Sequence, residues 1–416
     1  MSPGINVVAV IGAGVMGHGI AQVSALSGCE VRMVDVSEEL LRSGLERIKW
    51  SLGKLAEKKA LPESVEAVAN RIATTTNLAD GVKDIDYMIE AVPENIELKM
   101  KTFAEADKSA PPDAILATNT SGLSVTMISE ATKRPNKVVG MHWMNPPQMM
   151  PLIEVIVGKH TGDETLKTTM ELCQRFGKQP VVARKDIWFF LAARSESGWD
   201  TEASLMWLRG EAKIEEIDAM ARYKLNLPMG PFELWDLTGA VDIVRGAYTS
   251  IDKILAKNPD FEPDPVRLHI FKRLAEQISI PRSEEGKSGM KTGEGYYKYP
   301  GPGKYARPEI AKELAEKVAP IDVLASAVNT ASRSVTEGVG SIEDTDKCFK
   351  LAFGWPKGVF EFADEYGIHN VVNALWEKKA RVPDWQKPFY RPDSLLLRMV
   401  EDGRIGRIVG EGFYRY

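Results

Sequence analysis

The sequence predicts an α/β fold: an N-terminal, doubly wound parallel sheet followed by two tandem all-helical domains. Strand-like apolar runs alternate with helical patterns through residue 183, as a doubly wound sheet requires. A glycine-rich turn follows the first of these runs, and a stretch of the helical half occurs twice. We therefore expect domains at residues 1–184, 185–305 and 306–416.

The expected strands are eight short runs rich in β-branched and other apolar residues. They lie at residues 6–11, 30–34, 71–75, 87–91, 114–117, 138–141, 152–156 and 180–183. Polar or unusual residues stand at or just past several strand ends: Gly12, Asp35, Glu90 with Glu94, Asn119 with Ser121, and His142. The carboxyl ends of parallel strands form the ligand crevice of an open sheet, so these residues are predicted to line one site.

The glycine-rich turn is typical of a Rossmann-like, dinucleotide-binding domain. Gly12 permits the tight turn, Gly14 lets a pyrophosphate approach the backbone, and Gly17 allows the helix to pack on its strand. Asp35 ends the second strand, where it would accept hydrogen bonds from an adenosine ribose and repel a 2′-phosphate. No Arg follows in residues 36–41, which favours NAD over NADP. An ordinary glycine turn is the alternative interpretation.

The helical half contains an internal repeat. Residues 214–239 align without a gap to residues 342–367, with nine identical positions. A second motif follows each copy, at residues 293–299 and 410–416, and a Pro/Gly-rich segment at 299–303 separates the copies. Chance similarity between amphipathic helices is the alternative, but the order of both motifs favours duplication of a whole domain.

Composition limits the class of protein. The chain has 416 residues, 44% of them hydrophobic, and a formal net charge of −5, so we expect a globular protein that binds neither nucleic acid nor an anionic membrane. A local basic cluster at Lys54, Lys58 and Lys59 could still bind an anion.

Cysteine usage and the N-terminus predict a cytoplasmic protein. Cys29, Cys173 and Cys348 are too scattered for a disulfide framework or a zinc site, so no metal is expected. The first strand begins within a few residues of Met1, which leaves no room for a signal sequence, and no apolar run reaches membrane-spanning length.

The strongest catalytic candidates are His142 and Glu154. An imidazole is the side chain best suited to take a proton near neutral pH, and a carboxylate on its other nitrogen would fix the tautomer. The chain has only five His, and this one stands at the cofactor-facing edge. The alternatives are a structural imidazole and, for Glu154, a carboxylate at a sheet edge facing water.

Five motifs together resemble the L-3-hydroxyacyl-CoA dehydrogenase family. They are the glycine motif with Gly19-Ile20-Ala21, Glu90-Ala91-Val92-Pro93-Glu94-Asn95, Thr118-Asn119-Thr120-Ser121, His142-x-x-Asn145-Pro146, and Lys291-Thr292-Gly293-Glu294-Gly295-Tyr296-Tyr297. The second helical copy resembles the tandem arrangement of the longer members, including multifunctional fatty-oxidation enzymes.

The resemblance implies a catalytic role for three residues. His142 would take the hydroxyl proton while C3 gives its hydride to NAD, Glu154 would orient His142, and Ser121 would hydrogen-bond the reacting oxygen. The alternative role for Ser121 is to cap a helix that begins near Leu123.

The resemblance also implies binding residues. For NAD these are the glycine motif with Met16, then Asp35, Glu94, Lys99, Ser121, Asn145 and Lys291. Glu94 with Lys99 could instead be an exposed helix salt bridge. Ser51 and Lys58, together with Ser121, would bind the acyl-CoA substrate; a solvated helix face is the alternative for Ser51 and Lys58.

One segment departs from the family pattern. After Lys185-Asp186 the family continues with a Pro-Gly-Phe turn and an Asn-Arg pair, whereas this chain has residues 187–194, IWFFLAAR. Ala193 replaces the Asn, so one hydrogen bond to the reacting group is lost or comes from elsewhere. Trp188 and Phe189 either line a narrow pocket for short acyl chains or pack the domain junction.

The sequence therefore predicts an NAD-dependent dehydrogenase of (S)-3-hydroxyacyl-CoA, with a short substrate such as 3-hydroxybutyryl-CoA. A dehydrogenase of a free hydroxy acid or sugar acid, and a non-catalytic NAD-binding paralogue, are the alternatives. The extra helical copy predicts either a monomer with an internal pseudo-dimer or a homodimer.

Overall fold

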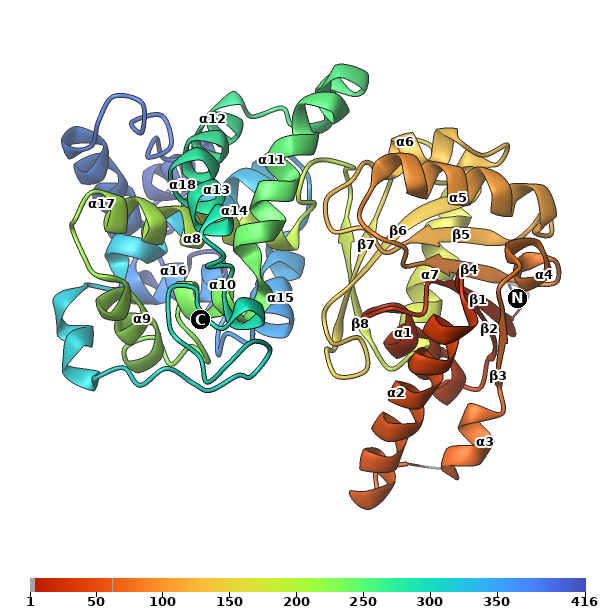
Figure 1. The fold of residues 1–416 in the computed structure, drawn as a ribbon. Coiled ribbons are helices and arrows are strands. Elements are labelled where there is room, and N and C mark those ends of the chain that lie inside the picture. Colours follow the sequence, from red (N-terminus) through yellow and green to blue (C-terminus); the bar gives the residue numbers. More distant parts are fainter. Residues whose placement is uncertain (1–3, 62) are drawn as a thin grey trace. The chain divides into compact units, whose positions relative to one another are not determined.

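The structure is a computed structural model that describes residues 4–61 and 63–416 (Figure 1). It divides into two compact units, with the boundary between Phe190 and Leu191. The first unit contains the sheet, and the second contains both copies of the helical repeat.

The first unit is built on one eight-stranded sheet, and all eight predicted strands are confirmed. They are β1 (Val7–Ile11), β2 (Glu30–Val34), β3 (Ile72–Thr75), β4 (Tyr87–Glu90), β5 (Ile115–Thr118), β6 (Val138–Trp143), β7 (Leu152–Ile156) and β8 (Gln179–Ala183). The strand order is β3-β2-β1-β4-β5-β6-β7-β8. The order reverses at β1, so the crevice at its carboxyl end is the expected ligand position.

The expectation of a wholly parallel sheet is wrong at one place. Strand β7 runs antiparallel to β6 and parallel to β8, so the last two strands are opposed to the first six. The reason is the connection at residues 144–151, which contains no helix and is too short for a parallel crossover. An antiparallel return is the only direction that such a loop permits.

Helices cover both faces of this sheet. They are α1 (Gly17–Leu26), α2 (Glu38–Glu57), α3 (Val65–Ala69), α4 (Leu78–Val82), α5 (Ile96–Ser109), α6 (Val125–Glu130) and α7 (Asp163–Arg175), with a 3-10 turn at Pro135–Lys137. Helix α1 packs with α2 and α3, while α5 packs with α4 and α6 (Figure 1). Ser37 and Asn95 begin α2 and α5 by accepting hydrogen bonds from backbone amides of the first turn.

The second unit is built from helices, with isolated antiparallel β-bridges at residues 289–304 and 406–415. Its helices are α8 (Ala192–Leu208), α9 (Ile214–Tyr223), α10 (Pro231–Thr238), α11 (Ala240–Lys257), α12 (Pro265–Leu274), α13 (Ile280–Glu284), α14 (Ile321–Thr336), α15 (Ile342–Ala352), α16 (Val359–Tyr366), α17 (Ile368–Arg381) and α18 (Ser394–Glu401). A π-helical turn at Ala275–Ser279 joins α12 to α13, and 3-10 turns lie at Pro259–Phe261, Met290–Thr292, Lys312–Lys317 and Arg407–Val409. Across the described residues of both units, no helix is long and apolar enough to cross a bilayer.

The identical residues of the two copies make the same contacts. Asp218 accepts hydrogen bonds from the Phe232 and Glu233 amides and from the Tyr297 hydroxyl. Asp346, its counterpart in the second copy, accepts bonds from Phe360, Glu361 and Tyr414 in the same pattern. Each carboxylate therefore connects the N-terminus of one helix, α10 or α16, to the tyrosine-containing motif that ends its copy, at residues 293–299 or 410–416.

Glycine is required beside each of these aspartates. A methyl group built on Gly230 would overlap the Asp218 carboxylate, and one built on Gly358 would overlap the Asp346 carboxylate. The repeat thus retains glycine where a buried carboxylate reaches helix N-terminal amides.

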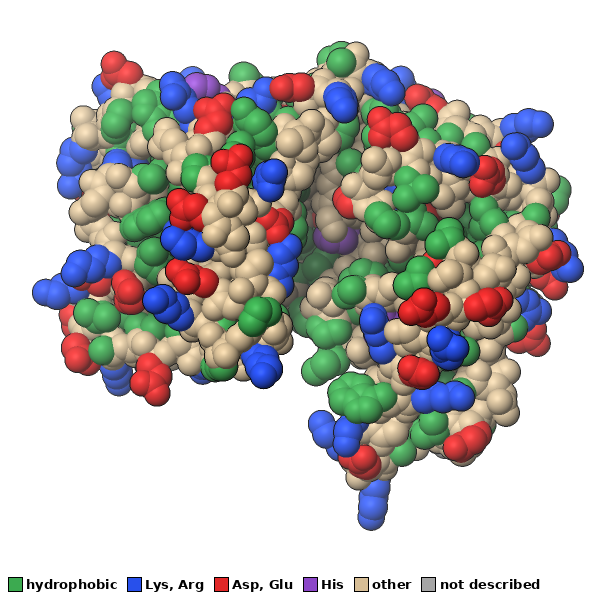
Figure 2. All heavy atoms as spheres, in the orientation of Figure 1, with side chains coloured by type: hydrophobic (Ala, Val, Ile, Leu, Met, Phe, Trp, Pro, Cys, Tyr) green, Lys and Arg blue, Asp and Glu red, His purple; other side chains and the backbone are tan. Residues whose placement is uncertain are grey.

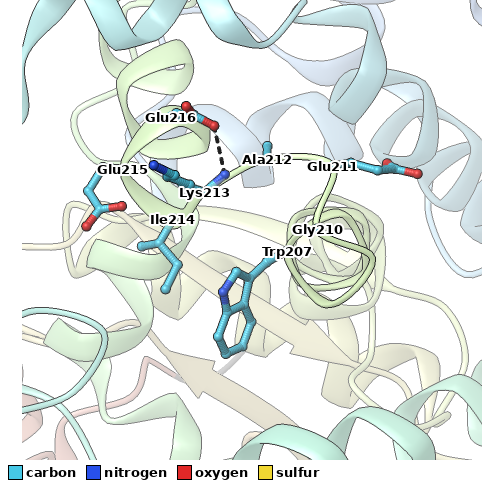
Figure 3. A pocket seen from close by; sticks show the side chains of 8 residues that line it. All are labelled: Trp207, Gly210, Glu211, Ala212, Lys213, Ile214, Glu215 and Glu216. Carbon is cyan, nitrogen blue, oxygen red and sulfur yellow. Dashed lines mark hydrogen bonds between the residues drawn. The ribbon is translucent and has the colours of Figure 1, made fainter.

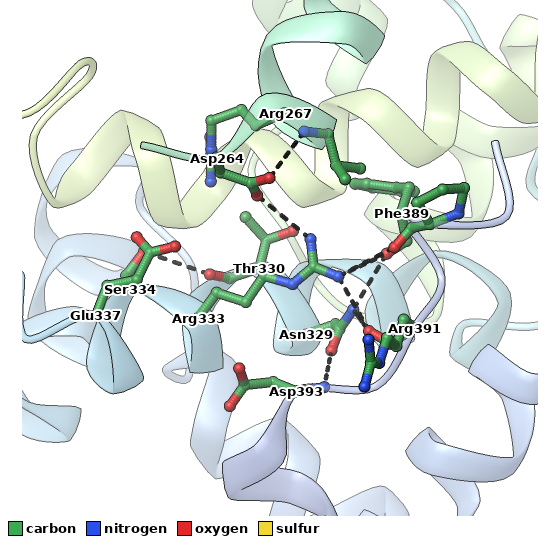
Figure 4. Close-up of polar contacts among 12 residues, drawn as sticks. Asp264, Arg267, Asn329, Thr330, Arg333, Ser334, Glu337, Phe389, Arg391 and Asp393 are labelled. Carbon is green, nitrogen blue, oxygen red and sulfur yellow. Dashed lines mark hydrogen bonds and ion pairs between the residues drawn. The ribbon is translucent and has the colours of Figure 1, made fainter. Parts of the chain in front are cut away.

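The two copies meet along α8 and α14. Gly198 allows the close approach, because a side chain there would overlap the Ser326 carbonyl of α14. Figure 4 shows polar contacts near this seam, where Arg333 pairs with Asp264 at 3.6 Å and donates to the carbonyls of Phe389 and Arg391. The helical copies are therefore joined by backbone proximity and by the partly buried Arg333–Asp264 ion pair.

Candidate active site

The glycine turn between β1 and α1 has the conformation that its spacing predicts. Gly12 has φ +106°, and a Cβ there would lie 2.6 Å from the Ala91 carbonyl oxygen. A Cβ on Gly17 would overlap the Gly12 carbonyl, so only glycine lets α1 start so close to the strand. Beside Gly14 nothing lies within 4 Å, which leaves open space next to the amides at the helix start.

Asp35 stands at the end of β2 and faces this turn. Its Oδ2 accepts a hydrogen bond of 2.6 Å from the Ala13 amide, and its Oδ1 accepts one of 2.7 Å from the Val36 amide. A carboxylate has further lone pairs, so both oxygens can still accept hydrogen bonds from a ribose. The residues present fit a dinucleotide with a free 2′-hydroxyl.

His142 and Glu154 form a hydrogen-bonded pair across β6 and β7. They are directly opposite in the antiparallel register, and His142 Nδ1 lies 3.0 Å from Glu154 Oε2. The Glu154 side chain is completely buried, so the alternative of an edge carboxylate facing water is wrong. The imidazole keeps 13% exposure, which leaves Nε2 as the nitrogen available to a ligand.

Glu94 organises the turn after β5. Its Oε1 accepts hydrogen bonds from the Thr120 hydroxyl at 2.6 Å and from the Ser121 amide at 2.9 Å. Ser121 itself is exposed. Its alternative role as a helix cap is wrong, because α6 begins at Val125 and is capped by Ser124.

Lys99 forms ion pairs with both Glu94 and Glu90. Its side chain is fully buried on α5, with Nζ 2.7 Å from Glu90 Oε1 and 3.3 Å from Glu94 Oε2. The interpretation of Glu94 and Lys99 as an exposed helix salt bridge is therefore wrong. Burial raises the pKa of Glu90, while the Lys99 ammonium and the Thr118 hydroxyl oppose that rise. Sequence reasoning placed Glu90 at a strand end but missed its bond to Lys99.

The loop between β6 and β7, residues 144–151, is held by a lysine that the sequence did not single out. Lys178 is nine-tenths buried, and its Nζ donates to the Pro147 carbonyl at 2.7 Å and to the Met150 carbonyl at 2.8 Å. Burial lowers the pKa of Lys178. Asn145 stands in the same loop and is exposed.

Asn119 ties the β5 turn to the end of β6. Its side-chain Oδ1 accepts a hydrogen bond of 2.8 Å from the Trp143 amide, one residue beyond His142. The turn that carries Ser121 and the strand that carries His142 are thereby connected, so the structure brings the three predicted catalytic residues to one edge of the sheet.

The residues expected to bind CoA lie on helix α2. Ser51 is half-buried, Lys58 is exposed just past the helix end, and their spacing puts them on one face, two turns apart. Trp50, beside Ser51, is 69% exposed. In Figure 2, Lys and Arg side chains lie next to hydrophobic ones along the projecting α2 of Figure 1. Lys58 and Trp50 thus offer a cation and an aromatic ring that are compatible with a nucleotide, while Lys54 on the same helix is paired with Glu57.

Two further predicted positions lie in the helical unit. Lys291 is exposed in the 3-10 turn at Met290–Thr292, and its ammonium forms an ion pair with Asp242. Ala193 is half-buried at the start of α8.

The matches to known families bear on both units. The family description "3-hydroxyacyl-CoA dehydrogenase, NAD binding domain" matches residues 7–187. The description "3-hydroxyacyl-CoA dehydrogenase, C-terminal domain" matches residues 190–299 and residues 322–416. The chain belongs to the 3-hydroxyacyl-CoA dehydrogenase family. Its first unit is the NAD-binding domain of that family.

Relatives and solved structures agree with this family. The chain is 38% identical over 298 residues to human mitochondrial hydroxyacyl-coenzyme A dehydrogenase, covering 70% of this chain and 90% of that protein. It is 37% identical to a probable 3-hydroxybutyryl-CoA dehydrogenase of Deinococcus radiodurans, covering 70% and 99%. A crystal structure of Escherichia coli 3-hydroxybutyryl-CoA dehydrogenase superposes with a TM-score of 0.80 at 26% identity, covering 96% and 100%.

Two hollows in the helical unit are not this dehydrogenase site. One, of about 510 Å³, is lined by Trp207 and residues 210–216 (Figure 3), and the other, of about 800 Å³, by Arg222, Tyr223 and residues 307–311. No predicted site residue lines either of them. Within the described residues, no group of three His, Cys, Asp or Glu could hold a metal ion.

Proposed function

We propose that this chain is an NAD-dependent dehydrogenase that interconverts (S)-3-hydroxyacyl-CoA and 3-oxoacyl-CoA. The observation that carries this proposal is the His142–Glu154 hydrogen bond in a unit whose glycine turn fits a dinucleotide. When bound, NAD supplies the hydride chemistry at C3 of the substrate.

The roles of the three catalytic candidates follow from their contacts. With Nδ1 bonded to Glu154, His142 would use Nε2 to take the hydroxyl proton in oxidation and return it in reduction. Glu154 orients the ring and stabilises its cation. Ser121, whose amide is tied to Glu94, would hydrogen-bond the reacting oxygen with its exposed hydroxyl.

We also propose which residues bind NAD. Gly12, Gly14, Met16 and Gly17 would bind the pyrophosphate, and Asp35 the adenosine ribose. Glu94, Ser121 and Asn145 would bind toward the nicotinamide, and Lys291 of the helical unit would add a further contact. Lys99 is fully buried, so it would act by holding Glu94.

For the acyl-CoA substrate, we propose Ser51 and Lys58 as contacts of the CoA part, and 3-hydroxybutyryl-CoA as a representative short chain. Their common face on α2 and the neighbouring exposed Trp50 support a nucleotide contact.

We also propose a three-domain organisation with a duplicated helical domain, supported by the matched contacts of Asp218 and Asp346. Because α8 and α14 already pack together, the duplicated surface would be satisfied within one chain as a pseudo-dimer. Sedimentation is expected to give a monomer; a stable homodimer held through α8 and α14 would contradict this. A reducing, cytoplasmic location fits the burial of all three cysteines, Cys29, Cys173 and Cys348.

The test of the function is an NADH absorbance assay with 3-oxoacyl-CoA thioesters and, in parallel, free 3-oxo acids and sugar acids. Turnover of thioesters is the expected result. Turnover of free acids alone would favour the alternative dehydrogenase, in which the α2 face has no CoA to bind. NADH binding without turnover of any compound would favour a non-catalytic paralogue. The one sequence feature that suggests this alternative is Ala193 in place of the family's Asn.

A further inference from the structure

The last residues of the sheet unit adopt an unusual backbone. Phe189 has φ +63° and Phe190 has φ +49°, so two consecutive aromatic residues are in the left-handed region. In the described part of the chain, Lys59 and Asn226 are the other non-glycine residues with positive φ. A bulky side chain is disfavoured in this region, and such residues persist where the surroundings over-determine them.

Contacts within the sheet unit hold this segment in place. Asp186 accepts hydrogen bonds from the Ser124 hydroxyl at 2.8 Å and from the Thr126 amide at 2.7 Å, which ties the segment to α6. Trp188 is buried, and its ring stacks on Phe189 with centroids 4.5 Å apart and planes 20° apart. The sequence left two interpretations for Trp188 and Phe189, a wall of the acyl pocket or packing. The burial of Trp188 favours packing for that residue.

Phe189 differs from Trp188 because its side chain remains partly exposed. A Cβ built on Gly122 would lie 3.5 Å from Phe189 Cδ1, so the ring lies against the turn that carries Ser121. The Phe190 ring meets the His142 imidazole edge-on, with centroids 6.4 Å apart. Of the two left-handed residues, Phe189 thus lies beside Gly122, the neighbour of Ser121, and Phe190 lies beside His142.

We propose that the Phe189 ring is a specificity-determining wall that restricts this enzyme to short 3-hydroxyacyl chains. The inference rests on the proposed function, because the substrate carbon must reach both Ser121 and His142. A flat apolar surface beside Ser121 occupies space that a longer acyl chain would need. A glycine would adopt φ +63° without strain, yet the chain carries an aromatic ring there. The backbone turn by itself therefore does not require an aromatic side chain at this position.

The experiment compares chain-length profiles of the full-length protein. We would measure kcat/KM for 3-oxobutyryl-CoA and 3-oxodecanoyl-CoA in wild type, Phe189→Gly and Phe189→Asn, since Gly and Asn both tolerate the left-handed conformation. Asn226→Gly is the matched control, because it relieves a left-handed residue, φ +55°, in the helical unit. Circular dichroism and the dissociation constant of NADH monitor folding and the cofactor site.

The wild type and Asn226→Gly are expected to prefer the four-carbon substrate. Removing the ring is expected to raise the ten-carbon to four-carbon ratio of kcat/KM by about tenfold, with NADH affinity unchanged. An unchanged ratio in folded variants, or equal gains at both lengths, would overturn the role of Phe189 while leaving the dehydrogenase assignment intact. A wild type that already accepts both lengths equally would also overturn it. No thioester turnover by the wild type would reject the proposed function, and this inference with it.

Discussion

His142 and Glu154 are direct neighbours across an antiparallel strand pair, with Nδ1 and Oε2 3.0 Å apart. A rigid sheet therefore fixes both the distance and the ring orientation, so no loop has to fold to form the pair. Because the carboxylate is completely buried, its remaining interactions are with protein and not with bulk water. This arrangement leaves one imidazole nitrogen, Nε2, for proton transfer.

Replacing His142 by Gln is expected to lower kcat by about a hundredfold or more, because general acid–base catalysis typically contributes this much. NADH affinity should stay within about threefold of the wild type. The control is His160→Gln, which removes a partly exposed imidazole 3.4 Å from Glu130 and should leave kcat unchanged. Activity close to wild type in His142→Gln would remove His142 from the role of base.

Replacing Lys99 by Met is expected to lower the free energy of unfolding by about 3–5 kcal/mol, since it leaves the buried Glu90 carboxylate without its cation. The double variant with Glu90→Gln should recover part of this loss. Chemical denaturation measures both, and Lys101→Met, an exposed position of the same helix, is the control. Equal losses in the single and double variants would argue against an energetic coupling between Lys99 and Glu90.

Replacing Lys178 by Met is expected to weaken NADH binding by about tenfold, because the loop with Asn145 loses its two hydrogen bonds to Nζ. Binding of ADP-ribose, which lacks the nicotinamide, should be unchanged. Fluorescence titration measures both ligands, and Lys167→Met on the exposed face of α7 is the control. If both ligands weaken equally, the lysine stabilises the whole domain and does not position this loop.

Replacing Gly358 by Ala is expected to destabilise the helical unit by about 1–3 kcal/mol, because the methyl group would overlap the Asp346 carboxylate. Gly246→Ala, within α11 and with nothing inside 4 Å of the new methyl, should instead stabilise by about 0.5–1 kcal/mol. Thermal unfolding followed by circular dichroism distinguishes the two. A neutral Gly358→Ala would mean that the Asp346 bonds rearrange at little cost.

Stability is expected to fall as the pH rises from about 4 to about 7. Burial raises the pKa of Asp200 to about 7, and the Trp235 indole, by bonding its carboxylate, opposes the rise; burial also raises the pKa of neighbouring Glu196. In this pH range the folded state keeps protons on these two carboxyl groups that the unfolded chain has released. Each group therefore lowers the free energy of unfolding by at most about 1.4 kcal/mol per pH unit. Asp200→Asn should flatten the dependence of unfolding temperature on pH; an equally steep profile would contradict this.

Local sequence patterns were sufficient to predict the strands and the glycine turn. Apolar runs of five or so residues bounded by polar ones specify buried strands, and Gly12 and Gly17 mark positions where a Cβ would meet backbone. The repeated Asp218 and Asp346 also carried a readable signal, because the same residue recurred with the same partners in order. These features depend on residues that are close in sequence or on a motif present twice.

The tertiary structure alone decided the direction of β7 and the burial of Lys99 and Lys178. Whether a lysine is solvated or enclosed depends on which helix or loop packs over it, and no periodicity in its own segment encodes that neighbour. The sequence determined that an imidazole and a carboxylate stand twelve residues apart near a dinucleotide turn. Only the antiparallel register, imposed by the short return at residues 144–151, placed them face to face, because strand pairing is a long-range contact.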